Sequence, residues 1–217
     1  MDEQENIRAY KDRLRIFLIL YFFAEDYSEA SNPSFKKIFK SEGRIQKIDF
    51  LLRNPDYLAF ELLNIARKEN SKSSDIKQIV RDIFKNKEPI LRRLEMEKFF
   101  FGAYEDIDDV IGFLDSIDFI KFTSKRSPDL KTREKQYIIT STAINKMDNS
   151  ISSLPSLQWY VDRCLLIKKY FGDLTGTQLK VAQYQIDEYR DTSYKNYIGS
   201  IQDLVVDEFN NLYNEQL

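Results

Sequence analysis

The carboxylates between Glu105 and Asp118 are the densest set of side chains in the chain that could bind a cation. A helix would place Asp106 and Asp109, three positions apart, on one face, where both could coordinate a divalent metal. Six acidic residues lie within these fourteen positions, however, so pairs at this spacing arise by chance: Glu105, Asp106, Asp108, Asp109, Asp115 and Asp118. We therefore interpret the segment as a negatively charged surface and expect no metal there.

Other catalytic arrangements find little support in the sequence. Glu95, Glu97 and Lys98 resemble part of the carboxylate and lysine set of a nuclease, but the surrounding apolar spacing predicts a helix rather than the strand that would place them around a metal. The chain has no histidine, which removes the commonest general base and zinc ligand. Cys164 lies among apolar residues and is expected in the core. With no glycine-rich phosphate loop either, we expect a non-enzymatic protein without a cofactor.

The acidic segment lies within an order of elements that is typical of the second half of a winged helix. Apolar residues at helical spacing from Ile107 to Leu114 predict a helix. Two strand-like runs, 119–122 and 137–140, follow around a polar loop at 123–136. Ser141 is expected to cap a further helix over 142–147. Helix, hairpin and helix together predict a winged helix-turn-helix-like core.

Charge contradicts the usual use of such a core. The helix in the DNA-reading position would carry only negative charge and would be repelled by phosphate, which favours a protein partner for Asp106 and Asp109. The hairpin, by contrast, has a local balance of plus four, and its cations are the expected DNA contacts unless the tip is simply a solvated loop: Lys121, Lys125, Arg126, Lys131, Arg133 and Lys135.

Length and composition predict a folded protein, and helical apolar spacing makes it mainly α with a small β-hairpin. Its 217 residues are 42% hydrophobic, enough for a large core. A net charge of −2 and a pI near 5.5 argue against gripping duplex DNA as the main task. The longest apolar run, 16–24, is too short to cross a bilayer and no cleavable signal precedes it, so we expect a cytoplasmic protein without membrane contact.

Helical spacing predicts the remaining elements. A first helix is expected from Ile7 to Tyr21, a second amphipathic stretch over 35–48, a third helix over 74–85, and a fourth that starts at Pro89 and runs toward 99–101. The serine-rich stretch 149–156 is the expected linker between a domain over 1–148 and a helical region over 157–217. The terminal helix, 194–212, would bury Ile201, Val205 and Phe209 either on its own domain or in a partner's groove.

One string gives a family resemblance. Residues 47–58 have the pattern Lys-x-Asp-Phe-x-x-Arg-x-Pro-x-Tyr-Leu, and the first helix contains a Leu- and Phe-rich stretch at 14–23. Together with the later string 172–180, Gly-Asp-Leu-Thr-Gly-Thr-Gln-Leu-Lys, followed by Tyr184, these features resemble the small middle component of ABC-three-component systems, the group that includes Lamassu-type antiphage defence. The resemblance spans most of the chain.

The resemblance implies a non-enzymatic subunit that binds an SMC-like coiled-coil ATPase, which in turn carries or restrains an effector such as a nuclease. Arg53, Asp56 and Tyr57 would then present a rigid turn to the ATPase, since arginine and aromatic residues are enriched at binding hot spots. A free winged-helix transcriptional regulator is the alternative. The acidic helix, the negative net charge and the lack of a clear dimerisation zipper count against it.

Overall fold

The computed structural model describes residues 3–126 and 132–217, which form two compact units, each built from two separate segments of the chain. Unit 1 comprises Met1–Asp49 and Asp106–Gly176, and unit 2 comprises Phe50–Glu105 and Thr177–Leu217. The division therefore differs from the expected one at 149–156. The structure is 63% helical with a small antiparallel sheet, which confirms the mainly α fold class.

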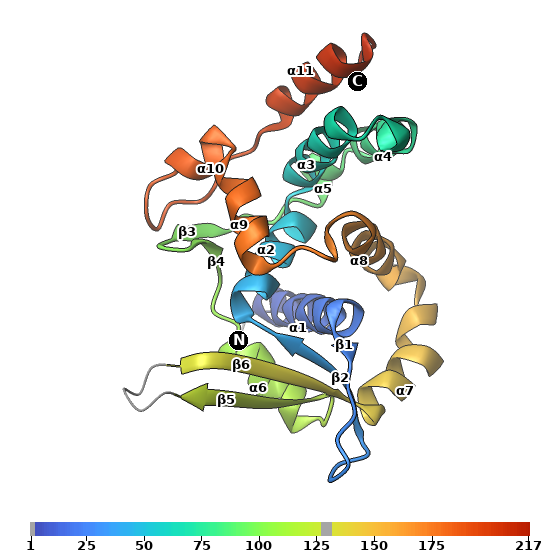
Figure 1. Cartoon of the computed structure of the whole chain (residues 1–217), viewed down its shortest axis with the longest axis vertical. Coiled ribbons are helices and arrows are strands. Elements are labelled where there is room, and N and C mark those ends of the chain that lie inside the picture. The colour runs from blue at the N-terminus through green and yellow to red at the C-terminus, as the bar shows by residue number, and fades with distance from the viewer. Residues whose placement is uncertain (1–2, 127–131) are drawn as a thin grey trace. The chain divides into compact units, whose positions relative to one another are not determined.

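Unit 1 contains the winged-helix order of elements. They are α1 (Glu3–Phe23), β1 (Glu25–Asp26), β2 (Phe35–Lys40), α2 (Glu42–Arg53), α6 (Asp108–Ser116), β5 (Ile120–Arg126), β6 (Thr132–Thr140), α7 (Ser141–Asn149), the 3-10 turns η2 (Ile151–Ser153) and η3 (Pro155–Leu157), and α8 (Gln158–Phe171). The sheet is antiparallel, in the order β1-β2-β6-β5 (Figure 1). Helix α2 continues past residue 49 into unit 2, so the first segment of unit 2 is inserted between α2 and α6.

The strand β2 corrects the expectation of an amphipathic helix over 35–48. Its apolar residues at 35, 38 and 39 suit helical spacing, but Ile38 and Phe39 are buried and Ile38 pairs with Ile138 of β6. The partner strand lies about a hundred residues further along the chain, beyond the range of local periodicity. The hairpin strands also extend further than 119–122 and 137–140, and Thr140 rather than Ser141 caps α7, its hydroxyl accepting from the Ala143 N–H at 3.3 Å.

The core of unit 1 forms around α1, whose residues from Ile16 to Leu20 are all buried. Helices α6 and α8 and strands β2 and β6 pack against it. Residues 149–156, the expected linker, form η2 and η3 on the path from α7 to α8 inside the same unit.

Unit 2 is organised around α3 (Pro55–Lys68), which contacts α4 (Ser73–Lys85), α5 (Glu88–Leu91) and α11 (Gln202–Tyr213). Pro55 occupies the first turn of α3, where its missing N–H leaves no hydrogen bond unmade. The remaining elements are the 3-10 turn η1 (Asn70–Lys72), the hairpin strands β3 (Glu97–Phe99) and β4 (Gly102–Tyr104), α9 (Gly176–Tyr184) and α10 (Asp187–Asp191).

Two helix predictions in unit 2 were too long, whereas the helix at 74–85 is confirmed by α4. The helix that starts near Pro89 stops at Leu91, and the chain then forms the β3–β4 hairpin. The terminal helix begins only at Gln202, because residues 195–198 run along β3 instead. Among the described helices, none combines the length and the apolar character needed to span a bilayer.

Candidate interaction surfaces

The start of helix α6 and the residues before it present acidic side chains to solvent. Its apolar residues Ile111 and Leu114 are buried, while Asp106, Asp108 and Asp109 are exposed. The Asp106 carboxylate accepts a hydrogen bond from the Asp108 N–H at 2.9 Å, which satisfies one of the free donors at the start of the helix. The exposed face of α6 and the residues just before it are thus negatively charged, as the charge pattern of the sequence predicts.

Two expected DNA contacts of the hairpin are engaged in ion pairs with acidic groups of unit 1. The Lys121 ammonium lies 3.3 Å from Asp115 and 3.2 Å from Asp118. The hydrogen bonds to Asp118 and, to a lesser extent, to Asp115 raise the pKa of Lys121. The hydrogen bond from Lys121 in turn lowers the pKa of Asp118. Lys135 pairs with Glu42 and lies 3.7 Å from Asp108. Part of the positive charge of the hairpin is therefore already balanced by neighbouring carboxylates.

The other four expected DNA contacts belong to the outer part of the hairpin. The backbones of Lys125, Arg126 and Arg133 lie in β5 and β6, but their side chains are outside the described part of the structure. Lys131 lies outside the described residues altogether.

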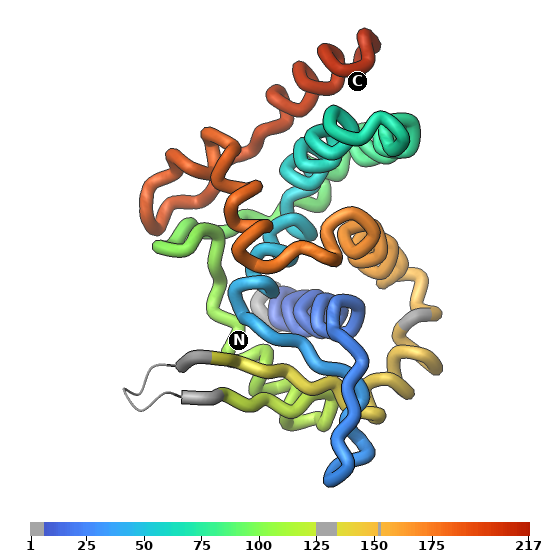
Figure 2. Tube along the Cα trace, viewed as in Figure 1, coloured from blue at the N-terminus to red at the C-terminus, as the bar shows by residue number. Residues whose placement is uncertain are grey.

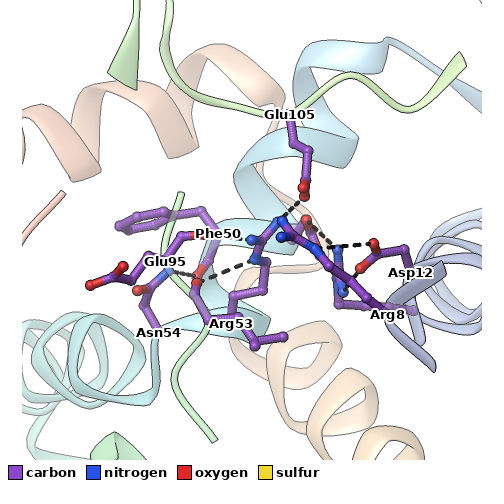
Figure 3. Close-up of polar contacts among 10 residues, drawn as sticks. Arg8, Asp12, Phe50, Arg53, Asn54, Glu95 and Glu105 are labelled. Carbon is purple, nitrogen blue, oxygen red and sulfur yellow. Dashed lines mark hydrogen bonds and ion pairs between the residues drawn. The ribbon is translucent and has the colours of Figure 1, made fainter. Parts of the chain in front are cut away.

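Arg53, an expected partner contact, is buried and binds groups of its own unit. Its Nε donates to the Leu94 carbonyl at 3.2 Å, one guanidinium nitrogen donates to the Glu95 carbonyl, and the other forms an ion pair with Glu105 (Figure 3). One side chain thereby ties the end of α2 to the segments on either side of the β3–β4 hairpin. The expectation of an exposed arginine was wrong because its acceptors lie 41 or more positions away.

Asp56 and Tyr57 are also buried, so the expected rigid turn is not offered to a partner. The Asp56 carboxylate accepts from the Ser200 hydroxyl at 2.8 Å and from the Ile201 N–H at 2.9 Å. The Tyr57 hydroxyl donates to the Gly199 carbonyl at 3.1 Å, and burial raises its pKa. Both residues hold the segment that enters α11.

The terminal helix packs on its own unit. Ile201, Val205 and Phe209 are at most 5% exposed, and α11 contacts α3. The partner-groove alternative for these residues is therefore wrong in this structure, and packing at home is confirmed. An ion pair between Arg67 on α3 and Glu208 on α11 supplements this packing.

The candidate catalytic groups are not assembled into a site. In the described part of the chain no group of three or more His, Cys, Asp or Glu residues could hold a metal ion. Glu97 and Lys98 lie in a strand rather than the expected helix, and the Lys98 ammonium binds the Arg190 carbonyl. Cys164 is fully buried and burial raises the pKa of its thiol to about 12, so the reactive thiolate is scarce at neutral pH.

A surface that the sequence analysis did not single out lies at the turn between β3 and β4. We call it the aromatic platform and define it by Phe100, Phe101, Tyr194 and Tyr197, which are 77%, 77%, 47% and 58% exposed. The signal in the sequence was the run of three phenylalanines before Gly102, toward which helical spacing had extended a helix from Pro89.

Comparisons of the chain with protein-family models, curated proteins and solved structures give no match.

Proposed function

We propose that the chain is a non-catalytic adaptor subunit of an SMC-like ATPase defence complex directed against phage or plasmids. In this proposal it bridges the coiled-coil ATPase and an effector such as a nuclease. The observation that carries the proposal is the exposed acidic face of α6 in a winged-helix order of elements. Such a face repels phosphate and is complementary to a basic protein surface.

The partner contact in this proposal lies on α6 rather than on the 47–58 string. Arg53, Asp56 and Tyr57 are buried and make hydrogen bonds within unit 2. These contacts explain the three residues of the string by the folding of unit 2. Asp106, Asp108 and Asp109 remain exposed. A protein partner with lysines or arginines in matching positions would pair with them.

Any DNA contact is assigned to the outer part of the hairpin. Lys121 and Lys135 would first have to leave their carboxylate partners. The exposed Lys121 pair contributes only about 0–1 kcal/mol, whereas the Lys135–Glu42 pair is partly buried. Lys125, Arg126, Lys131 and Arg133 are therefore the residues to test first.

The experiment is co-expression with the products of the flanking genes, followed by tagged purification and light scattering on a sizing column. We expect a stable complex that contains a coiled-coil ATPase. The variant Asp106→Lys/Asp109→Lys should weaken that complex at least tenfold by placing positive charge against a basic surface.

The matched control is Asp203→Lys/Asp207→Lys, which makes the same charge change on exposed positions of α11. It should leave the complex intact. Equal complex formation by both double variants would remove α6 from the interface, and the absence of any ATPase partner would refute the adaptor proposal.

A free winged-helix transcriptional regulator is the second candidate, favoured by the order of elements in unit 1. It requires the chain alone to bind duplex DNA from its own promoter at moderate salt. A dimer of the chain that binds this DNA tightly and sequence-specifically would favour the regulator over the adaptor. DNA binding only in the presence of the ATPase would exclude the regulator.

A further inference from the structure

The aromatic platform is held in place by a small sheet within unit 2. On one edge β3 pairs with β4, and on the other it exchanges main-chain hydrogen bonds with residues 195–198. Lys195 N–H donates to the Lys98 carbonyl at 2.7 Å, and Lys98 N–H donates to the Asn196 carbonyl at 2.9 Å. In Figure 2 this later segment passes beside the hairpin. Tyr194 thereby lies next to the hairpin turn, against Phe99 and Phe100, and Tyr197 lies opposite Glu97 at the start of β3.

Two rings of the platform, Phe100 and Tyr194, stack on each other, and Phe99 supports Tyr194. Phe100 and Tyr194 stack with their centroids 4.6 Å apart and their planes 28° from parallel. Phe99 contacts Tyr194 edge-on at 5.5 Å and Tyr104 edge-on at 5.4 Å. The Phe100 and Tyr194 rings are therefore preorganised, and a ligand that stacks on them would not first have to order them.

Two ammonium groups lie beside the same rings. Lys180 Nζ is 5.2 Å from the centre of the Phe101 ring, and Lys195 Nζ is 5.6 Å from the centre of the Tyr194 ring.

Three of the acidic groups on the neighbouring segments have partners of their own. Asp187 and Asp191 on α10 both pair with Arg190 at 2.8 Å. The Glu188 carboxylate accepts from the Gly199 N–H at 3.0 Å, and Glu97 on β3 is the acid nearest in sequence to the turn.

We propose that the aromatic platform binds single-stranded nucleic acid, with bases stacked on Phe100, Phe101 and Tyr194 and backbone phosphates near Lys180 and Lys195. A single strand combines flat base π-faces with a negatively charged phosphate backbone, which matches exposed rings flanked by cations. Duplex DNA, whose bases are already stacked on one another, offers no free base faces to these rings. The proposal does not depend on the adaptor function, because the full chain alone should bind.

The test uses the full chain and a fluorescein-labelled oligothymidine of about 20 nucleotides, with fluorescence anisotropy as the readout. We expect binding with a shallow salt dependence. Two phosphate contacts on a single strand give a slope of about −1.4 when the logarithm of the binding constant is plotted against the logarithm of the salt concentration. An abasic strand of the same length, which has phosphates but no bases, should bind at least tenfold more weakly.

Variants separate stacking from mere apolar contact. Phe100→Leu keeps apolar bulk but removes the π-face and should weaken binding roughly fivefold or more, whereas Phe100→Trp should retain or strengthen it. The matched control is Ile90→Ser/Leu91→Ser, which removes apolar side chains that are 68% and 70% exposed elsewhere in unit 2 and should leave binding unchanged.

Three results would overturn the proposal. They are no binding by the folded chain at about 100 μM, equal binding of the abasic strand, or a Phe100→Leu variant that binds like the wild type. Binding of phosphatidylserine vesicles that is lost in Phe100→Leu, with no oligonucleotide binding, would identify a lipid surface as the ligand and would equally refute it.

Discussion

The Asp56 carboxylate accepts the Ile201 N–H at 2.9 Å, across 145 positions of sequence, and both residues are buried. The same carboxylate oxygen accepts the Ser200 hydroxyl at 2.8 Å. One side chain at the start of α3 therefore positions the start of α11 and closes unit 2 between its two segments.

Replacing Asp56 with alanine should destabilise the protein by about 1–3 kcal/mol, because the buried Ile201 N–H would lose its acceptor. Denaturant unfolding followed by circular dichroism would measure the loss. Asp203→Ala, an exposed change in the first turn of α11, should cost only a few tenths of a kcal/mol. A loss of equal size in both variants would contradict the role given to Asp56.

The Arg15–Asp49 pair in unit 1 makes a second prediction. Arg15 Nε lies 2.5 Å from the Asp49 carboxylate, both side chains are at most 2% exposed, and Asp12 adds a second contact at 2.6 Å. Arg15→Met leaves a buried carboxylate without this cation and should cost about 3–5 kcal/mol.

The double variant Arg15→Met/Asp49→Leu should recover much of that loss, since it removes the buried charge as well. Lys72→Met, which breaks an exposed pair with Glu69, should stay within about 0.5 kcal/mol of the wild type. If the double variant is no more stable than Arg15→Met, the removal of this cation from the buried Asp49 carboxylate is not the cause of the loss.

Glu61 on α3 predicts a pH dependence. Burial raises its pKa from 4.5 to about 7, opposed by a hydrogen bond from Asn64 and by the charge of Lys68. Between these two values the folded state binds a proton that the unfolded state releases. Stability from this group is therefore fully present below about pH 4.5 and is lost as the pH rises through about 7.

Glu61→Gln tests that dependence. The free energy of unfolding of the variant should match or fall below that of the wild type at pH 5, and should exceed it at pH 8 by about 1–3 kcal/mol. A pH-independent difference between the two proteins would show that Glu61 is not titrating in this range.

Two glycines of unit 1, Gly176 and Gly112, should respond to substitution with opposite changes in stability. A Cβ on Gly176 would lie 3.1 Å from the Arg44 nitrogen, whereas a Cβ on Gly112 in α6 would meet nothing within 4 Å. Gly176→Val should therefore destabilise by about 1–3 kcal/mol, and Gly112→Ala should stabilise by about 0.5–1 kcal/mol through helix propensity. Thermal unfolding of both variants would check these signs, and destabilisation by Gly112→Ala would contradict the open space at that helix face.

The elements that could be predicted from the amino-acid sequence are those whose information is local. Helix α4, the order of α6, hairpin and α7, and the outward acidic face of α6 all follow from apolar spacing and charge over a few turns. Those patterns depend on neighbours three or four positions away, which the sequence displays directly.

Tertiary contacts alone reveal what covers each polar residue and where the units divide. Arg53, Asp56 and Tyr57 have residue types that are common at binding hot spots. They are buried because their hydrogen-bond partners lie between 41 and 145 positions away in the sequence. Strand β2 likewise depends on β6, and residues 195–198 on β3. Hydrogen bonds between distant segments leave no periodic trace in the chain, so helical spacing alone favoured the wrong structure at these positions.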